Sequence, residues 1–167
     1  MNCTVRRASE SDADLLSLLN ADVQNLHAAA MPERFKESGA DTFPASAARA
    51  LLVKPNNLVF IAEVGSEPAG YAYAEIVHLG ESSLVHAWDE VYLHHLSVRP
   101  AWRRKGVAGA LLDRVRAAAD ELGIGPMTLQ VWAFNDGARA FFQQRGFTPY
   151  MMRLWDRQSP PISLERD

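Results

Sequence analysis

Hydrophobic and polar residues follow two rhythms along this chain, and each rhythm predicts one type of element. Apolar residues spaced three or four positions apart, such as Leu15, Leu19 and Val23, are typical of a helix with one buried face. Short apolar runs, such as residues 58–62 and 70–77, indicate strands. The chain shows both patterns, which predicts a domain that combines helices with a sheet.

The order of the elements determines the expected sheet. Three successive strands with short links favour antiparallel pairing, whereas the strand–helix–strand crossover between residues 88–98 and 127–132 requires a parallel pair. The expected fold class is therefore α/β, with a mixed, mostly antiparallel sheet in the order β-α-α-β-β-β-α-β-α-β. We expect one domain over residues 1–155 and a loose polar tail over 156–167. The expected strands cover residues 4–8, 58–62, 70–77, 88–98, 127–132 and 147–155, and the expected helices lie near 15–26, 44–53, 107–122 and 135–145.

Composition narrows the classes of function. The 167 residues are 48% hydrophobic and 22% charged, which is ordinary for a globular protein. The formal net charge of −3 argues against a generally basic nucleic-acid binder, and the single cysteine, Cys3, excludes an intramolecular disulfide and a multi-cysteine zinc site. Because the chain has neither a membrane-spanning apolar run nor the apolar region of a signal peptide at its start, we expect a cytoplasmic protein with no nucleic-acid or membrane partner.

A basic, glycine-containing turn lies between the strand at 88–98 and the long helix that follows. Small residues let a ligand approach the backbone, and the first amides of the helix have no partner within it. With the helix dipole, such a turn suits a diphosphate, although a solvated basic turn would have the same composition. No Walker A tripeptide or dinucleotide fingerprint is present. The small residues are Gly106, Ala108 and Gly109, and the cations are Arg99, Arg103, Arg104 and Lys105.

This turn and a second segment resemble the GNAT acyltransferases, over about residues 4–155. The family signature R/Q-x-x-G-x-G/A is matched by Arg103-x-x-Gly106-x-Ala108. A second signature, N-x-x-A-x-x-F-Y-x-x-x-G-F, is matched by Asn135, Ala138, Phe141, Gly146 and Phe147. The resemblance implies the GNAT fold and an acyl-CoA-dependent N-acetyltransferase. Such an enzyme transfers an acetyl group from acetyl-CoA, its co-substrate, to a primary amine by direct attack through a tetrahedral intermediate.

The resemblance also implies which residues hold the co-substrate. Backbone groups near Leu96 and Val98 would hold the pantetheine arm like an added strand, and the amides of the basic turn would hold the pyrophosphate. Asn135 would contact the pantetheine, unless it serves only as a helix cap. Where the family often has a tyrosine as general acid, this chain has Phe142, which can pack but cannot donate a proton, so Tyr92 and Tyr150 are substitutes to consider. The expected co-substrate set is Leu96, Ser97, Val98, Arg103, Arg104, Lys105, Gly106, Val107, Ala108, Gly109, Asn135 and Phe142.

The expected base lies on the strand at 88–98. Relatives of the polyamine and arylalkylamine types have a Glu or His as proposed base where this chain has His94, and the ordinary pKa of histidine suits that role. Glu90 is the second candidate, and a satisfied core histidine is the alternative reading of His94. Strict alternation groups His94 with Glu90, Tyr92, Leu96 and Val98, and places His95 on the other face with Val91, Leu93 and Ser97. A β-bulge, which this family often has in the corresponding strand, could exchange the roles of His94 and His95.

The neighbouring strand offers further polar side chains. Tyr73 and Glu75 share one face with Tyr71 and could line an amine site, with Glu75 or Asp89 attracting a cation, or they could form a solvated sheet face. The eight-residue spacing of His78, His86 and His94 does not match a metal site, so no metal is expected.

Three questions stay open from sequence alone. The acceptor is a small-molecule or peptide amine whose identity the sequence does not give. A homodimer could form through an edge strand or the 156–167 tail. The rival functions are a non-catalytic acyl-CoA-binding or regulatory module, favoured by Phe142, and a nucleotide-binding structural protein.

Overall fold

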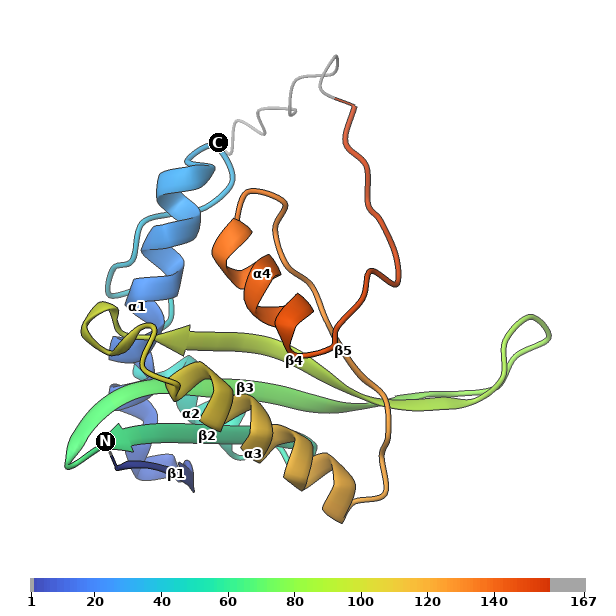
Figure 1. Ribbon diagram of the computed structural model, residues 1–167, viewed down its shortest axis with the longest axis horizontal. Coiled ribbons are helices and arrows are strands. Elements are labelled where there is room, and N and C mark those ends of the chain that lie inside the picture. The colour runs from blue at the N-terminus through green and yellow to red at the C-terminus, as the bar shows by residue number, and fades with distance from the viewer. Residues whose placement is uncertain (1, 157–167) are drawn as a thin grey trace. The chain divides into compact units, whose positions relative to one another are not determined.

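The structure, a computed structural model, describes residues 2–156 and divides into two compact units (Figure 1). The first unit is Met1–Gln130 and the second is Val131–Asp167. The sheet and the predicted base and turn belong to the first unit. Two of the expected co-substrate residues, Asn135 and Phe142, belong to the second.

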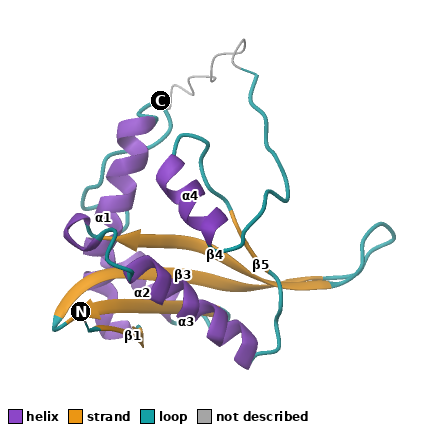
Figure 2. Cartoon of the chain, in the orientation of Figure 1, coloured by secondary structure: helices purple, strands orange, loops and turns teal. Residues whose placement is uncertain are grey.

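The first unit contains the predicted mixed sheet (Figure 2). Its strand order is β1-β2-β3-β4-β5, antiparallel except for the parallel pair β4–β5, which confirms the fold class. The strands are β1 (Cys3–Arg7), β2 (Asn57–Val64), β3 (Glu67–Leu79), β4 (Trp88–Val98) and β5 (Met127–Leu129). The helices are α1 (Ala13–Ala30), α2 (Ala45–Leu52) and α3 (Val107–Glu121), with short 3-10 turns at Glu10–Asp12 and Pro100–Trp102.

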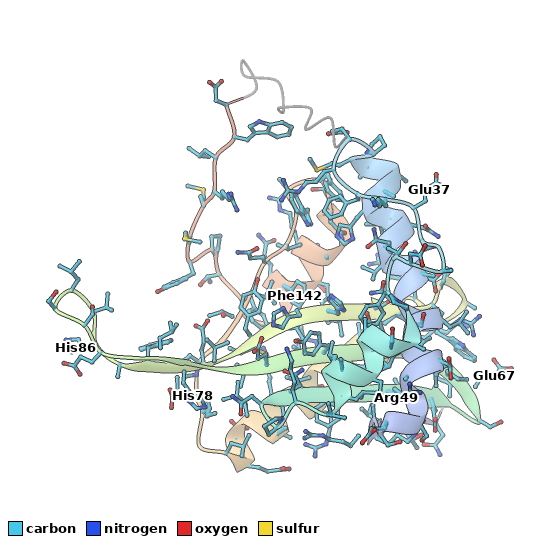
Figure 3. The ribbon with its side chains drawn as sticks, turned by 180° about the vertical axis from the view of Figure 1, so that it is seen from behind. Glu37, Arg49, Glu67, His78, His86 and Phe142 are labelled. Carbon is cyan, nitrogen blue, oxygen red and sulfur yellow. The ribbon has the colours of Figure 1, made fainter. Side chains whose placement is uncertain are left out.

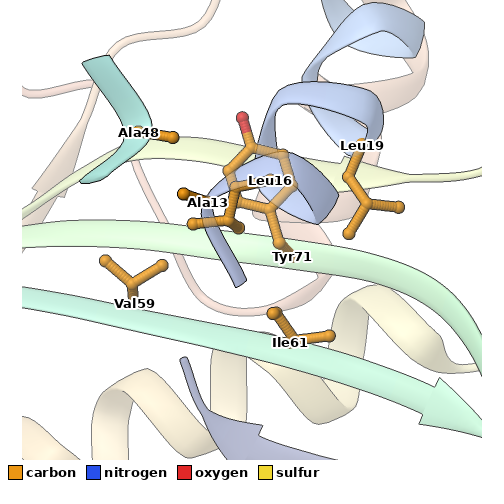
Figure 4. Close-up of a cluster of buried hydrophobic side chains, with 7 residues drawn as sticks. All are labelled: Ala13, Leu16, Leu19, Ala48, Val59, Ile61 and Tyr71. Atoms are coloured by element: carbon orange, nitrogen blue, oxygen red, sulfur yellow. The ribbon is translucent and has the colours of Figure 1, made fainter. Parts of the chain in front are cut away.

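Helices α1 and α2 pack on one face of the sheet and α3 packs on the other. The helical spacing of apolar residues explains this, because it gives each helix one apolar stripe that must be buried. The core under α1 and α2 is shown in Figure 4, where Tyr71 lies beneath the two helices. Leu16 and Leu19 of α1 are each only 1% exposed, and burying a leucine contributes about 1.5–3 kcal/mol. This cluster consists of Ala13, Leu16, Leu19, Ala48, Val59, Ile61 and Tyr71.

A β-bulge interrupts β4 at His94. Tyr73 of β3 pairs with His95, but the next residue, Ala74, pairs with Leu93, so His94 is an extra residue in β4. An extra residue reverses the alternation of side chains beyond it. The strict alternation expected from the sequence is therefore wrong after His94.

The bulge moves two side chains to the α1 face of the sheet. The ring of His95 bonds Tyr71, which lies under α1, and the Ser97 hydroxyl donates to the Leu19 carbonyl of α1 at 3.1 Å. Leu96 and Val98 consequently lie on the α3 face, opposite His94, whereas the sequence grouped all three together. The bulge that was considered from the sequence is thus present, and it places His94 and His95 on one face.

Gly70 allows β3 to pass close to this part of β4. A Cβ atom at Gly70 would lie 2.3 Å from the carbonyl oxygen of Ser97. Because backbone atoms must move to relieve that overlap, we expect Gly70→Ala to lower the free energy of unfolding by about 1–3 kcal/mol. In thermal unfolding, the melting temperature should fall by roughly 2–4 °C for each kcal/mol of stability that is lost. Gly80→Ala is the control because a Cβ there meets no atom within 4 Å, and equal melting temperatures for the two variants would contradict the expectation.

The β3–β4 hairpin extends beyond its neighbouring strands as a two-stranded arm. β2 pairs with β3 as far as Glu75, and β5 pairs with β4 from Val91 onward, so the arm lies past both. Figure 3 shows His78 and His86 on the arm. His78 Nδ1 lies 2.9 Å from Asp89 Oδ1, in an exposed pair.

The second unit contains helix α4 (Asp136–Gln144). Within this unit the Phe142 ring packs against Phe141 and Phe147, with ring centroids 5.2 and 5.4 Å apart. The strand predicted over 147–155 is wrong, because residues 147–156 form no strand. Pro149 lacks an N–H for a ladder, and side chains beyond it, such as Tyr150 at 91%, are exposed rather than packed on a sheet face. Of the predicted tail, 157–167 lie outside the described residues.

Candidate active site

The predicted phosphate-binding turn has a distinctive backbone. Gly106 adopts φ 85°, in the left-handed region, immediately before α3 begins. The first bond that closes the helix runs from the Ala110 N–H to the Gly106 carbonyl at 3.0 Å, so the amides of Val107, Ala108 and Gly109 have no acceptor inside the helix. These outward amides, together with the positive end of the helix dipole, suit an anion.

Formal charge reinforces the anion-binding character of the turn. Residues 91–112 contain no Asp or Glu, and the four cations of the turn are exposed. Arg103 Nε donates to the Val98 carbonyl at 3.0 Å, which ties the turn to the end of β4. Arg104 has φ 62°, an uncommon conformation for a residue with a side chain. The turn is therefore held in a defined shape by its neighbours.

The parallel ladder between β4 and β5 ends where the bulge begins. The ladder contains three pairs, from Val91–Met127 to Leu93–Leu129, while β4 continues to Val98. The stretch from His94 to Val98 therefore lies past the last pair with β5. Leu96 and Val98, the expected backbone partners of the pantetheine, lie in this stretch, and their role stays a prediction.

The His94 ring is held by three side chains on the α1 face. Its Nε2 lies 2.8 Å from Glu75 Oε2, and a carboxylate only accepts hydrogen bonds, so Nε2 donates. The Tyr73 ring stacks on it at 4.6 Å with an interplanar angle of 8°, and the Tyr92 ring meets it edge-on at 4.7 Å. Its side chain is 31% exposed. His94 is thus an ordered, solvent-accessible imidazole and not a core histidine.

The other two expected catalytic residues are placed differently. The Glu90 carboxylate already accepts hydrogen bonds from Thr128 Oγ1 at 3.0 Å and from Trp88 Nε1 at 3.3 Å. Burial, with the charge of Glu90 acting in the same direction, raises the pKa of Tyr92 above its ordinary value. Tyr92 therefore stays protonated at neutral pH and can donate a hydrogen bond beside His94. Because the Glu90 carboxylate already accepts hydrogen bonds from Thr128 and Trp88, His94 is the better candidate for the base.

His95 belongs to a separate, buried chain of hydrogen bonds. Asn20 Nδ2 donates to the Tyr71 hydroxyl at 2.8 Å, and that hydroxyl lies 2.8 Å from His95 Nδ1. Since the Tyr71 oxygen accepts a hydrogen bond from Asn20, the Tyr71 hydroxyl can donate its own hydrogen bond to Nδ1 of His95, and the neutral ring then carries its hydrogen on Nε2. The sequence analysis did not identify Asn20 as part of this site. Its signal was its position four residues after Leu16, where the apolar stripe of α1 predicts a hydrophobic residue.

Acid should destabilise the protein through His95. Burial lowers the pKa of His95 to about 4, and the nearby His94 and His27 act in the same direction. Because an unfolded histidine titrates near 6.5, the unfolded chain takes up a proton first as the pH falls. The contribution of His95 to the free energy of unfolding is full above about pH 6.5 and is lost as the pH falls through 4, by roughly 3 kcal/mol.

Urea unfolding between pH 7 and pH 4 measures this loss. His95→Gln removes the titrating ring, so its free energy of unfolding should fall less steeply with acid than that of the parent protein. Equal slopes for the two proteins would contradict the assignment.

The second unit holds the remaining expected site residues. Asn135 Oδ1 accepts from the Ala138 amide at 3.1 Å, so Asn135 does cap α4. Phe142 is 9% exposed and packs within the unit. Contacts of either residue with a co-substrate stay predictions. Among the described residues, no three His, Cys, Asp or Glu side chains are grouped to hold a metal ion.

Comparisons with known proteins identify the family. The model of the Acetyltransferase (GNAT) family matches residues 20–147, so the chain belongs to the GNAT acetyltransferase family. The resemblance noted in the two sequence signatures is thereby confirmed. No curated protein sequence matches the chain. None of the helices in the described part of the chain has the length and apolar character needed to cross a membrane.

Solved structures share this fold at low sequence identity. A mutant of the BH1408 protein from Bacillus halodurans has a TM-score of 0.86 at 18% identity, over 91% of this chain and 97% of that chain. AAC(6')-Iy, in complex with a bisubstrate analogue of CoA and acetylneamine, has a TM-score of 0.74 at 19% identity, over 94% and 98%. A transcriptional regulator from Bacillus halodurans C-125 has a TM-score of 0.72 at 20% identity, over 93% and 99%.

Proposed function

We propose that this protein is an N-acetyltransferase that transfers an acetyl group from acetyl-CoA to a primary amine. The observation that carries the proposal is the placement of His94. It is a solvent-accessible imidazole at the bulge where the β4–β5 ladder ends, on the strand that leads directly into the anion-binding turn. One strand would thus connect the proposed proton acceptor to the proposed diphosphate site.

The residues of the turn fit the co-substrate. The amides of Val107, Ala108 and Gly109 and the nearby cations match a diphosphate in charge and in hydrogen bonding. The β4 backbone at Leu96 and Val98 would hold the pantetheine beyond the parallel ladder. When bound, acetyl-CoA supplies an acyl group activated as a thioester. Structures of AAC(6')-Iy contain CoA and a CoA-based bisubstrate analogue, which supports acyl-CoA as the donor here.

The side chains beside His94 suit a cationic acceptor. A primary amine is mostly protonated at neutral pH, and removing its proton costs about 4–5 kcal/mol. Glu75 adds negative charge and the rings of Tyr73 and Tyr92 add aromatic surface, both of which attract a cation. His94 accepts one proton from the ammonium group, and the neutral nitrogen then forms its bond to the acyl carbon. The C–S bond of the thioester breaks, and the sulfur leaves as the CoA thiol with the second proton lost by the nitrogen. Aminoglycoside acetyltransferases among the structural neighbours support an amine acceptor.

A coupled thiol-release assay tests this function. The purified full chain is supplied with acetyl-CoA and a panel of aminoglycosides, polyamines, amino acids and peptides. Calorimetry with CoA is run in parallel. We expect CoA to bind and at least one amine to be turned over. Binding of CoA with no turnover of any acyl-CoA on any amine would contradict the proposed activity.

A non-catalytic acyl-CoA-binding module is the second candidate. Phe142 stands where the family often has a proton-donating tyrosine, and one structural neighbour is described as a transcriptional regulator. This candidate predicts CoA binding without turnover, whereas the proposed enzyme needs little help in expelling a thiol whose ordinary pKa is near 8.5. The same assay separates the two. Competition by ATP that equals competition by CoA would instead favour a general nucleotide binder.

A further inference from the structure

We propose that Glu75 is a positioning residue that keeps Nδ1 of His94 unprotonated and free for the acceptor amine. The inference rests on the proposed function, since it concerns the state of the base. In this proposal a residue of β3 sets the protonation of the base, which lies on the neighbouring strand β4.

The sheet places Glu75 within reach of only one nitrogen of His94. Glu75 pairs with Tyr92 across the β3–β4 ladder, so His94 is its diagonal neighbour two residues further along β4. Tyr73 covers one face of the imidazole and Tyr92 lies edge-on to it. Held in this way, the ring presents Nε2 to the carboxylate at 2.8 Å.

The hydrogen bond determines which nitrogen carries the proton. A carboxylate accepts and cannot donate, so Nε2 of His94 keeps its hydrogen. In the neutral ring the lone pair is then on Nδ1, for which the described residues offer no partner. During acetyl transfer an amine N–H bond breaks and its proton is taken up at Nδ1, while Nε2 keeps its own. The resulting imidazolium is balanced by the charge of Glu75.

The neighbouring groups do not duplicate this role. Glu90 is occupied by Thr128 and Trp88. His95 uses its Nδ1 to accept from Tyr71, so the nitrogen it leaves free carries a hydrogen and cannot act as a base. Of these two adjacent histidines, only His94 has an accepting nitrogen that is not already engaged, and the contact with Glu75 determines that this nitrogen is Nδ1.

The hairpin arm provides a matched control pair. His78 and Asp89 form a second histidine–carboxylate contact between the same two strands, at 2.9 Å, but with the histidine bonded through Nδ1. Their side chains are 58% and 56% exposed. The position is three residue pairs from Glu75 along the ladder. His78→Gln therefore changes a similar surface contact on the same hairpin without touching the His94 environment.

The experiment compares Glu75→Ala and Glu75→Gln with His78→Gln in the full chain. Steady-state kinetics give kcat and the KM for acetyl-CoA, and ¹⁵N NMR of the histidine side chains reports which nitrogen of His94 carries the proton. We expect Glu75→Ala to lower kcat about tenfold or more, with the KM for acetyl-CoA within about twofold of the parent protein. We expect kcat to fall less in Glu75→Gln than in Glu75→Ala, because glutamine keeps an oxygen that can accept the hydrogen bond from His94. His78→Gln should stay within about twofold of the parent protein in both constants.

The NMR readout separates this inference from the proposed function. The parent protein should show His94 protonated on Nε2, and Glu75→Ala should show a mixture of both tautomers. A parent spectrum with the proton on Nδ1, or a kcat for both Glu75 variants that equals that of His78→Gln, would overturn the positioning role. If no amine is turned over, the proposed function fails while the tautomer result still decides the role of Glu75. If Glu75→Ala does not fold, Glu75→Gln carries the comparison of kcat.

Discussion

Replacing His94 by glutamine should lower kcat by about two to three orders of magnitude, because a positioned general base contributes that much to a proton transfer. Glutamine keeps the size and polarity of the side chain but cannot take up a proton at neutral pH. The KM for acetyl-CoA should change little, since the turn proposed to bind the diphosphate follows the end of β4, whereas the His94 imidazole contacts Glu75, Tyr73 and Tyr92. Steady-state rates at saturating acetyl-CoA measure the effect.

Two matched variants make the His94 result specific. His78→Gln changes a histidine that also bonds a carboxylate on the same hairpin, and its kcat should stay within about twofold of the parent protein. Glu90→Gln tests the second candidate base. A larger loss of kcat in Glu90→Gln than in His94→Gln would transfer the role to Glu90. An unchanged kcat in both would mean that the amine loses its proton without either residue.

The sequence predicted the elements whose pattern repeats over many residues. The stripe of small and branched apolar residues over 107–122 predicted α3, and β4 was expected over the residues it occupies, because burial on one or both faces constrains every position along such elements. The basic turn was also predictable. Its small residues and cations are adjacent in sequence, so no tertiary contact was needed to bring them together.

The bulge at His94 could not be derived from the pattern of one strand. It arises from the register between β3 and β4, and the extra residue is recognised only when both strands are paired. The partner Glu75 was missed as a positioning group for the same reason. It lies 19 residues before His94, and the contact exists only because the hairpin returns at the right register. The buried link from Asn20 to His95 spans three elements and was likewise not predictable.

The strand predicted over 147–155 shows the opposite error. Hydrophobic residues there satisfied a local pattern, but a strand also needs a neighbouring edge for its amides and a surface for its side chains. Leu154, at 87% exposed, has no such surface in the described structure. Local pattern is therefore a reliable guide in this chain only where burial enforces it.

The proposed site depends on three consecutive parts of β4. Its first residues complete the arm, its bulge presents His94 beside Glu75, and its last residues lead into the turn at Gly106. The proposed base, His94, lies four residues before the end of β4 at Val98, which is roughly 13 Å of extended chain on the way to the turn. An extended ligand that is anchored by a diphosphate at the turn can therefore present its far end near His94.

Gly106→Val should weaken the binding of CoA by about ten- to a hundredfold. Gly106 has φ 85°, and a β-branched residue does not adopt that conformation without strain of about 1–3 kcal/mol. The backbone must leave the left-handed region to relieve the strain, and this turns the amides of Val107 and Ala108 away from a bound diphosphate. Calorimetric titration with CoA measures the change, which corresponds to about 1.4–2.8 kcal/mol of binding free energy.

Gly65→Val is the control that separates strain from binding. Gly65 has φ 65° in the turn between β2 and β3, and a Cβ there, as at Gly106, meets no atom within 4 Å. The two variants should therefore lose similar amounts of unfolding free energy. Only Gly106→Val should lose affinity for CoA, because only that turn opens onto unpaired helix amides. Equal affinities in the two variants would show that the diphosphate is held elsewhere, and the link between β4 and the anion site would fail with it.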